Sequence, residues 1–248
     1  VLLSFMLTAF ISVVISAFII YHEHRQKSIR SAHKLLLSFS DQQIVTGIVL
    51  QGIGLLKMKS LAPYHFFILW MLSLLSTVTH INTLLALIND FKRDWILRWV
   101  RQFFMLVNLV LSVTCGIILL MVVVKDLEPT LPIACVWKVP STSTPHNVWI
   151  SITGTIAVIA GQGIFFVVSV WYLHVKEKRM IPFIQISGLI FFTTVGIGAT
   201  ARVILVSDAF GTPSVPLADN GEKVWDFGQL LSMFLLILPF VAVMEKRP

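Results

Sequence analysis

Charged residues are scarce in this chain of 248 residues, where lysine, arginine, aspartate and glutamate together make up 12%. A soluble domain of this length carries about 25% charged residues. Hydrophobic residues make up 56% and the mean hydropathy is +0.87, so the chain lacks the polar surface that a protein of this size needs in water. This composition excludes an ordinary soluble protein and indicates a single domain embedded in a lipid bilayer.

The residue types that build metal, redox and covalent-catalysis sites are also few. The two cysteines, Cys115 and Cys135, form no framework, and no cluster of His, Cys, Asp or Glu has metal-ligand spacing. The carboxylates are scattered, and there is neither a phosphate-binding glycine-rich loop nor a nucleophile elbow. We therefore predict no metal and no cofactor, and the sequence assigns no catalytic residue.

Long apolar stretches, by contrast, are abundant. A membrane-spanning helix needs about 20 residues, with a range of roughly 17–25, and seven stretches approach or reach that length. They are 1–21, 41–56, 64–88, 103–124, 148–173, 181–206 and 224–244. The predicted fold is all-α, a single seven-helix transmembrane bundle over residues 1–248.

Basic residues predict how this bundle sits in the membrane. Thirteen lysines and arginines fall in the loops after the first, third and fifth predicted helices and in the tail, whereas five fall in the alternate loops. The side rich in lysine and arginine is normally cytoplasmic. We therefore expect the N-terminus outside and the C-terminus in the cytoplasm of a plasma membrane or endomembrane protein. The net charge of +7 is explained by anionic lipid headgroups rather than by nucleic acid.

The third predicted helix carries a stripe of polar residues. Helical spacing places these five on one face: Ser73, Ser76, Thr77, His80 and Thr83. Such a face is costly against lipid, so we expect it to point into the bundle. There, His80 and Thr77 either line a ligand pocket or bond neighbouring helices together, and the sequence leaves both readings open.

The second predicted helix offers polar partners for that stripe. Gln43, Gly47, Gln51 and Gly54 share one face, where the glutamines could bind a ligand or a neighbouring helix and the glycines allow close approach. The sequence Ser40-Asp41-Gln42-Gln43 resembles a capping box, which predicts that the helix begins at Asp41. We expect a cavity between the second, third, sixth and seventh helices, with Gln43 or Gln51 opposite His80.

The sixth and seventh predicted helices carry a second polar group. Arg202 lies about one turn from the end of stretch 181–206, and Asp226 lies at a comparable depth in stretch 224–244, with Gln229 one turn deeper. Arg202 and Asp226 could form a structural ion pair, or Asp226 and Gln229 could lie at the outer rim of a ligand site. Pro239 is expected to kink the last helix, which has no lysine for a retinal Schiff base.

Two stretches resemble a known family. Ser40–Gly47, read as Ser-Asp-Gln-Gln-Ile-Val-Thr-Gly, and Ser76–Leu84 are similar to the signature of a group of integral membrane proteins of filamentous fungi, and Trp225–Gln229 fits as well. The resemblance implies fungal origin and seven helices, and it implies no activity. Seven helices with the N-terminus outside is also the topology of G-protein-coupled receptors, although the rhodopsin-like motifs are missing, so only the topology is shared.

Three functions remain open on this reading. A receptor-like protein would bind a small lipid-soluble molecule within the bundle and contact a cytoplasmic signalling partner through its basic inner loops. A small membrane enzyme similar to fungal transmembrane terpene cyclases would use Asp41, Asp226 or His80 as acids. A transporter or structural membrane component is the third. The scattered carboxylates argue against the enzyme, and the odd helix number argues against a transporter, so the receptor-like function is favoured.

Overall fold

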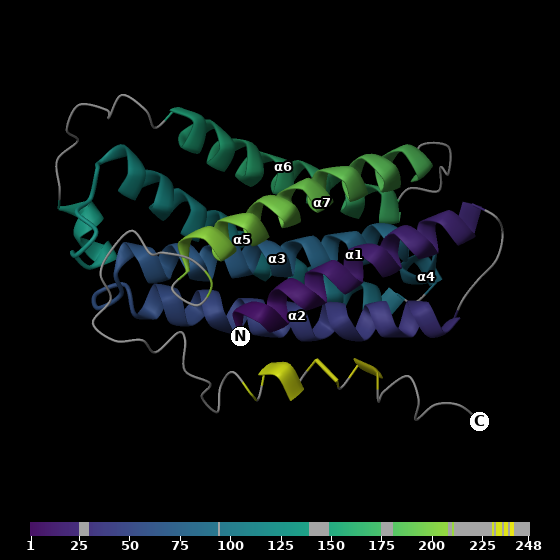
Figure 1. Ribbon diagram of the computed structural model, residues 1–248. Helices are drawn as coiled ribbons and strands as arrows, with labels where there is room; N and C mark the ends of the chain where they lie inside the picture. The colour runs from purple at the N-terminus through teal and green to yellow at the C-terminus, as the bar shows by residue number, and fades with distance from the viewer. Residues whose placement is uncertain are drawn as a thin grey trace.

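The described part of this computed structural model is helical. It describes residues 1–24, 30–93, 95–138, 149–174, 181–207, 210, 230, 232–234, 236–237 and 239–240, and these ranges contain no strand. The helices are α1 (Leu2–His24), α2 (Arg30–Leu56), α3 (Pro63–Ala86), α4 (Ile88–Arg93), α5 (Trp95–Val124), the 3₁₀ helix η1 (Ile133–Trp137), α6 (Trp149–His174) and α7 (Ile181–Val206). Consecutive long helices run in alternating directions between two ends of the bundle, which we call the η1 end and the α4 end (Figure 1).

Helix α3 occupies the centre of the bundle. It packs against α1, α2, α5, α6 and α7, and these five helices also contact one another in the ring order α1, α2, α5, α6, α7. Of the residues in the most apolar 18-residue segment of α3, 94% are buried, whereas the corresponding share is 17% in α6 and in α7. Figure 1 shows α6 and α7 on one side of α3 and α2 on the other. The third helix of the chain is therefore the scaffold on which the others are arranged.

The ring helices expose apolar residues and bury polar ones. Large hydrophobic side chains face outward at helical spacing, for example Phe10, Val14 and Phe18 in α1 and Phe183, Ile190 and Ile197 in α7. Ser4, Thr8, Ser12 and Ser16, one helical turn apart in α1, are buried instead. This pattern is the reverse of a soluble bundle and is the one expected when lipid is the solvent.

Among the described residues, five helices are long and apolar enough to cross a membrane: Leu2–His22, Pro63–Ala86, Arg98–Val124, Ile152–Trp171 and Ile181–Val206. They correspond to five of the seven predicted spans, and the chain is an all-helical integral membrane protein. Helix α2 is long enough, with 27 residues, but it is too polar to meet the same criterion. The predicted seventh span, 224–244, falls mostly outside the described residues.

The predicted start of the second helix is wrong. Helix α2 begins at Arg30, not at Asp41, and Ser40 is fully buried inside it rather than capping its first turn. The apolar residues before Ser40 explain the difference, because Leu36 and Phe39 are both completely buried against the bundle. Their burial stabilises helical turns that the Ser-Asp-Gln-Gln motif, considered alone, appeared to exclude.

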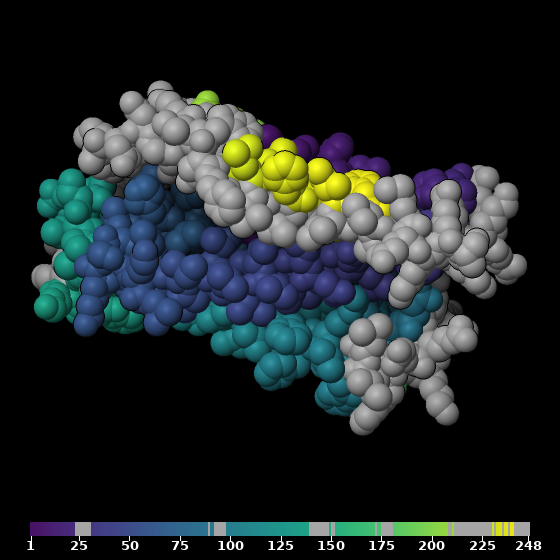
Figure 2. Space-filling view, turned by 90° about the horizontal axis from the view of Figure 1, so that it is seen from below, coloured from purple at the N-terminus to yellow at the C-terminus, as the bar shows by residue number. Residues whose placement is uncertain are grey.

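The described C-terminal residues lie along α1 and α2. The Ser4 hydroxyl donates a hydrogen bond of 3.0 Å to the Ser232 carbonyl, and the rings of Phe39 and Phe240 meet edge to face with centroids 5.5 Å apart. Figure 2 shows these residues, in yellow, against the purple and blue surface of the first two helices. Ser4 lies in the first turn of α1, toward the η1 end, whereas Phe39 lies in the α4-end half of α2.

Glycines of α6 and α7 differ in how closely neighbouring helices approach them. A Cβ atom on Gly161 would overlap the ring of Phe191, and one on Gly188 would overlap the side chain of Leu85. Gly154 of α6 and Gly198 of α7 have no atom within 4 Å of an added Cβ. Helices α6 and α7 therefore touch closely along only part of their length.

Candidate functional site

The polar stripe of α3 points into the bundle, as predicted. Ser73, Ser76, Thr77, His80 and Thr83 each have 1% or less of their surface exposed. Three of the hydroxyls bond to their own helix: Ser73 to the Trp70 carbonyl, Thr77 to that of Ser73 and Thr83 to that of Thr79. Such bonds satisfy a hydroxyl where no water is at hand. The hydroxyl of Ser76 instead donates a hydrogen bond of 2.6 Å to the Gln43 carbonyl of α2.

A hydrogen-bonded chain joins this stripe to α2 and α5. The side-chain nitrogen of Gln51 donates to the side-chain oxygen of Asn108 at 2.8 Å and to the Gly47 carbonyl at 3.0 Å. The side-chain nitrogen of Asn108 in turn donates to the Thr77 hydroxyl at 3.2 Å. Gly47 makes this contact feasible, because its missing Cβ would lie 2.5 Å from the Ser76 hydroxyl oxygen and 2.9 Å from the Asn108 oxygen.

The same network extends toward α6. The hydroxyls of Ser73 and Ser112 lie 3.3 Å apart, and Ser112 donates to Gln162 in α6 at 3.4 Å. The indole nitrogen of Trp70 donates to the Ser112 carbonyl at 3.1 Å. Asn108, Ser112 and Gln162 were not singled out as site residues from the sequence. The signal for the first two was available, because they lie one turn apart among mainly apolar residues of α5.

Several buried polar atoms have no hydrogen-bond partner among the described residues. Both ring nitrogens of His80 and both side-chain atoms of Asn82 are in this group, as are the side-chain oxygens of Gln43 and Gln51. A backbone interaction of His80 with Ser76, one turn earlier, falls short of good hydrogen-bond geometry. Buried polar groups normally have hydrogen-bond partners, so these residues have donors and acceptors that the described residues leave unsatisfied.

Charged residues gather at the α4 end. The Arg101 guanidinium of α5 pairs with the Asp41 carboxylate of α2, and it also lies 5.3 Å from the centroid of the Phe91 ring in α4. His33 of α2 lies 2.7 Å from the Asp90 carboxylate of α4. Asp41, predicted at a helix start, is therefore an internal residue of α2 that fixes α2 to α5.

Two cavities flank α7, and neither is the one expected beside His80. The larger, of about 490 Å³, lies between α3, α6 and α7, and the other, of about 360 Å³, lies between α1, α3 and α7. The larger cavity is lined by these residues: Phe67, Trp70, Met71, Leu74, Gly154, Thr155, Ala157, Val158, Phe191, Thr194, Val195, Gly198, Ala199 and Arg202. His80, Thr77, Gln43 and Gln51 line neither of them and are 1% or less exposed.

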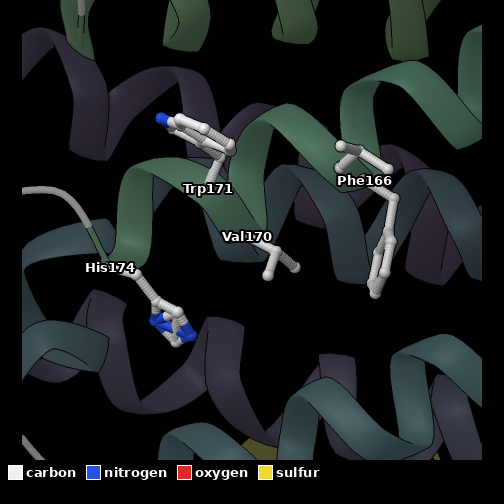
Figure 3. Close-up of a pocket in the computed structure, with 5 residues that line it drawn as sticks. Phe166, Val170, Trp171 and His174 are labelled. Carbon is white, nitrogen blue, oxygen red and sulfur yellow. The ribbon is translucent and has the colours of Figure 1, made fainter.

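A third hollow, of about 460 Å³, is an open apolar groove on α6. Phe166, Val170 and His174 project to one side of the helix and Trp171 to the other (Figure 3). The His174 ring also lies 5.4 Å, between centroids, from Trp99 of α5. The lining of this groove is almost entirely apolar, so it offers little to orient a ligand.

The second predicted polar group is described only in part. Arg202 is exposed and lines the larger cavity at its η1 end, whereas Asp226 and Gln229 lie outside the described residues. The predicted Arg202–Asp226 pair therefore stays a prediction. Within the described ranges, no three His, Cys, Asp or Glu side chains are grouped as metal ligands would be.

No family model, no curated protein and no solved structure matches this chain. The function therefore has to be argued from the geometry of the bundle and its cavities.

Proposed function

We propose that this protein is a receptor-like integral membrane protein of seven helices, which binds a small lipid-soluble molecule in the cavity between α3, α6 and α7. The cavity itself carries the proposal. Its volume of about 490 Å³ lies within the roughly 300–1,000 Å³ of small-molecule sites. Its lining is mainly apolar, with Thr155, Thr194 and Arg202 as polar groups. Since few residues of α6 and α7 are buried inside the bundle, a ligand reaches the cavity from the bilayer.

Two further segments, α2 and the C-terminal segment, support a total of seven crossings. The exposed stripe of α2 is apolar, with Val45, Val49, Ile53 and Leu56 facing outward, while the polar Gln43 and Gln51 face inward. The C-terminal residues contact α1 at Ser4 and α2 at Phe39, toward opposite ends of the bundle. With the excess of basic residues at the α4 end, this gives a cytoplasmic α4 end and an external η1 end.

A receptor-like function requires that the ligand site be connected to the rest of the bundle. Trp70 makes that connection, because it lines the cavity and its indole nitrogen bonds to the Ser112 carbonyl of α5. Ser112 belongs to the network that reaches Ser73 of α3 and Gln162 of α6. A ligand that moves Trp70 therefore acts on a contact between α3 and α5, and α5 also carries Arg101 at the α4 end, where a signalling partner would bind.

The enzyme and the transporter stay as alternatives with less support. A terpene-cyclase-like mechanism needs a carboxylic acid beside the substrate, and the described residues that line the cavity include none. Asp41 is engaged by Arg101, and His80 lies outside the cavity lining. If a molecule bound beside His80 rather than between α6 and α7, the cavity assignment would be wrong and the sequence-based site would be restored.

The cavity can be filled without disturbing the packing. Gly154 lines it and has no atom within 4 Å of an added Cβ, so Gly154→Leu should occupy the space that the ligand needs. Gly163 of the same helix is equally open and lines none of the described cavities, so Gly163→Leu is the matched control. Native mass spectrometry of detergent-washed protein should show a bound small molecule in the native protein and in the control but not in Gly154→Leu. Equal retention by all three would overturn the proposal.

A further inference from the structure

Arg202 gives the larger cavity a charged end. It lies four residues before the end of α7, about 6 Å along the helix axis, and it is exposed. The other described residues that line the cavity are uncharged. No acidic side chain of the described residues forms an ion pair with Arg202 within 4 Å. An arginine within a membrane span is costly unless it reaches the interface or an anion.

The shape of the cavity suits an extended chain that ends at that arginine. The lining residues Phe191 and Arg202 of α7 are 11 positions apart, or about 16.5 Å at 1.5 Å per residue. This is about half of the hydrocarbon core of roughly 30 Å, which is the depth of one leaflet. Figure 1 shows α6 and α7 diverging toward the η1 end, where the cavity lies. The opening therefore faces the acyl chains of the leaflet whose headgroups lie level with Arg202.

We infer that the ligand is a single-chain amphiphile with an oxyanion headgroup, a carboxylate or a phosphate, whose headgroup is held by Arg202 and whose chain lies along α7 toward Phe191. This inference rests on the proposed function of the cavity and specifies its ligand. The planar guanidinium of arginine binds carboxylate and phosphate oxygens in pairs, which a lysine or an amide cannot match. Thr155 and Thr194 are the other polar lining residues, and the Thr194 hydroxyl is already engaged by the Ile190 carbonyl.

The test compares charged and neutral probes on the purified full chain in nanodiscs of zwitterionic lipid. The probes are palmitate, its methyl ester and a single-chain lysophosphatidate, which separate a carboxylate from a phosphate headgroup at similar chain length. The proteins are the native chain, Arg202→Gln, Gly154→Leu and the control Gly163→Leu.

We expect one or both anionic probes to bind the native chain and Gly163→Leu, and Arg202→Gln to weaken that binding roughly 10–100-fold, as for a lost hydrogen bond to a charged group. Arg202→Gln should leave binding of the methyl ester unchanged, and Gly154→Leu should abolish all binding. If the ester binds as tightly as the acids and Arg202→Gln changes nothing, the headgroup inference is overturned but the cavity function stands. If no probe distinguishes Gly154→Leu from Gly163→Leu, the proposed function fails as well.

If Arg202 has only a structural role, its variants give a different result in the binding and stability measurements. If its partner is Asp226, Arg202→Gln and Asp226→Asn should lower thermal stability to a similar degree, and neither should change binding of the anionic probes. That outcome would contradict the inference and support the predicted ion pair.

Discussion

Arg101 of α5 and Asp41 of α2 form an ion pair at the α4 end of the bundle, although they stand 60 positions apart in the chain. The two partners differ in environment: the side chain of Arg101 is 10% exposed, and that of Asp41 is 52% exposed. The ion pair therefore compensates mainly the burial of the Arg101 charge, and Arg101 also packs over the Phe91 ring. The ion pair joins α2, which carries the polar partners of α3, to α5, which carries Ser112, and the Ser112 carbonyl accepts the hydrogen bond from Trp70.

We predict that Asp41→Asn lowers the free energy of unfolding by about 1–2 kcal/mol. A hydrogen bond to a charged group contributes roughly 1.5–3 kcal/mol, and the exposure of Asp41 reduces that value. Arg101→Met should have a similar effect, and the double variant should lose less than the sum of the two. Thermal unfolding in detergent measures all three. Strictly additive losses would show that the contact contributes nothing to stability.

A second prediction compares two glycines of α2. Gly47→Ala should destabilise the protein by about 1–3 kcal/mol, the usual cost of overpacking, because both neighbours of the new Cβ are held by hydrogen bonds. These neighbours are Ser76, bonded to the Gln43 carbonyl, and Asn108, bonded to Gln51. Gly52→Ala is the control, since its Cβ would meet no atom within 4 Å, and alanine should stabilise the helix by up to about 1 kcal/mol. Equal melting temperatures for the two variants would contradict the close approach at Gly47.

A third prediction concerns His80, for which the sequence predicted a role either in lining a ligand pocket or in bonding neighbouring helices together. Its two ring nitrogens lack hydrogen-bond partners among the described residues, so His80→Leu removes unsatisfied polar atoms at similar volume. We expect stability within about 1 kcal/mol of the native protein, or a small gain. A loss of more than about 2 kcal/mol would show that the ring is satisfied by a bound water or molecule. Changed retention of the co-purified molecule would place the ligand beside His80.

The fourth prediction tests the number and direction of the crossings. A reporter fused after Pro248 should be cytoplasmic, and tags inserted near Ser143 and near Ala218 should be accessible from outside intact cells. The tag near Ala218 and the reporter flank the seventh span, so opposite locations establish that crossing. Both on the same side would reduce the bundle to six spans, and an inaccessible tag near Ser143 would reverse the orientation.

The sequence alone determined that this is a helical membrane protein and which face of α3 is polar. Both follow from local rules, because lipid excludes unpaired backbone groups and buried charge, and a spacing of three or four residues defines a helix face. The predicted stretch 181–206 has the bounds of α7 for the same reason, because its apolar run is long enough for a complete span. The start of α2 was not, because Leu36 and Phe39 extend the helix by packing against parts of the bundle that are distant in sequence.

Only the tertiary structure decided which polar groups meet and where space is left. The partners Gln51 and Asn108 are 57 positions apart, and Asp41 and Arg101 are 60 apart, so no local pattern connects them. The sequence predicted a cavity beside His80, whereas the two cavities beside α7 are lined by other residues, and the larger of them lies between α3, α6 and α7. Gly154 and Gly161 show why. Both are small residues of one helix, but the Phe191 ring covers Gly161 and nothing covers Gly154, which only the relative position of the two helices determines.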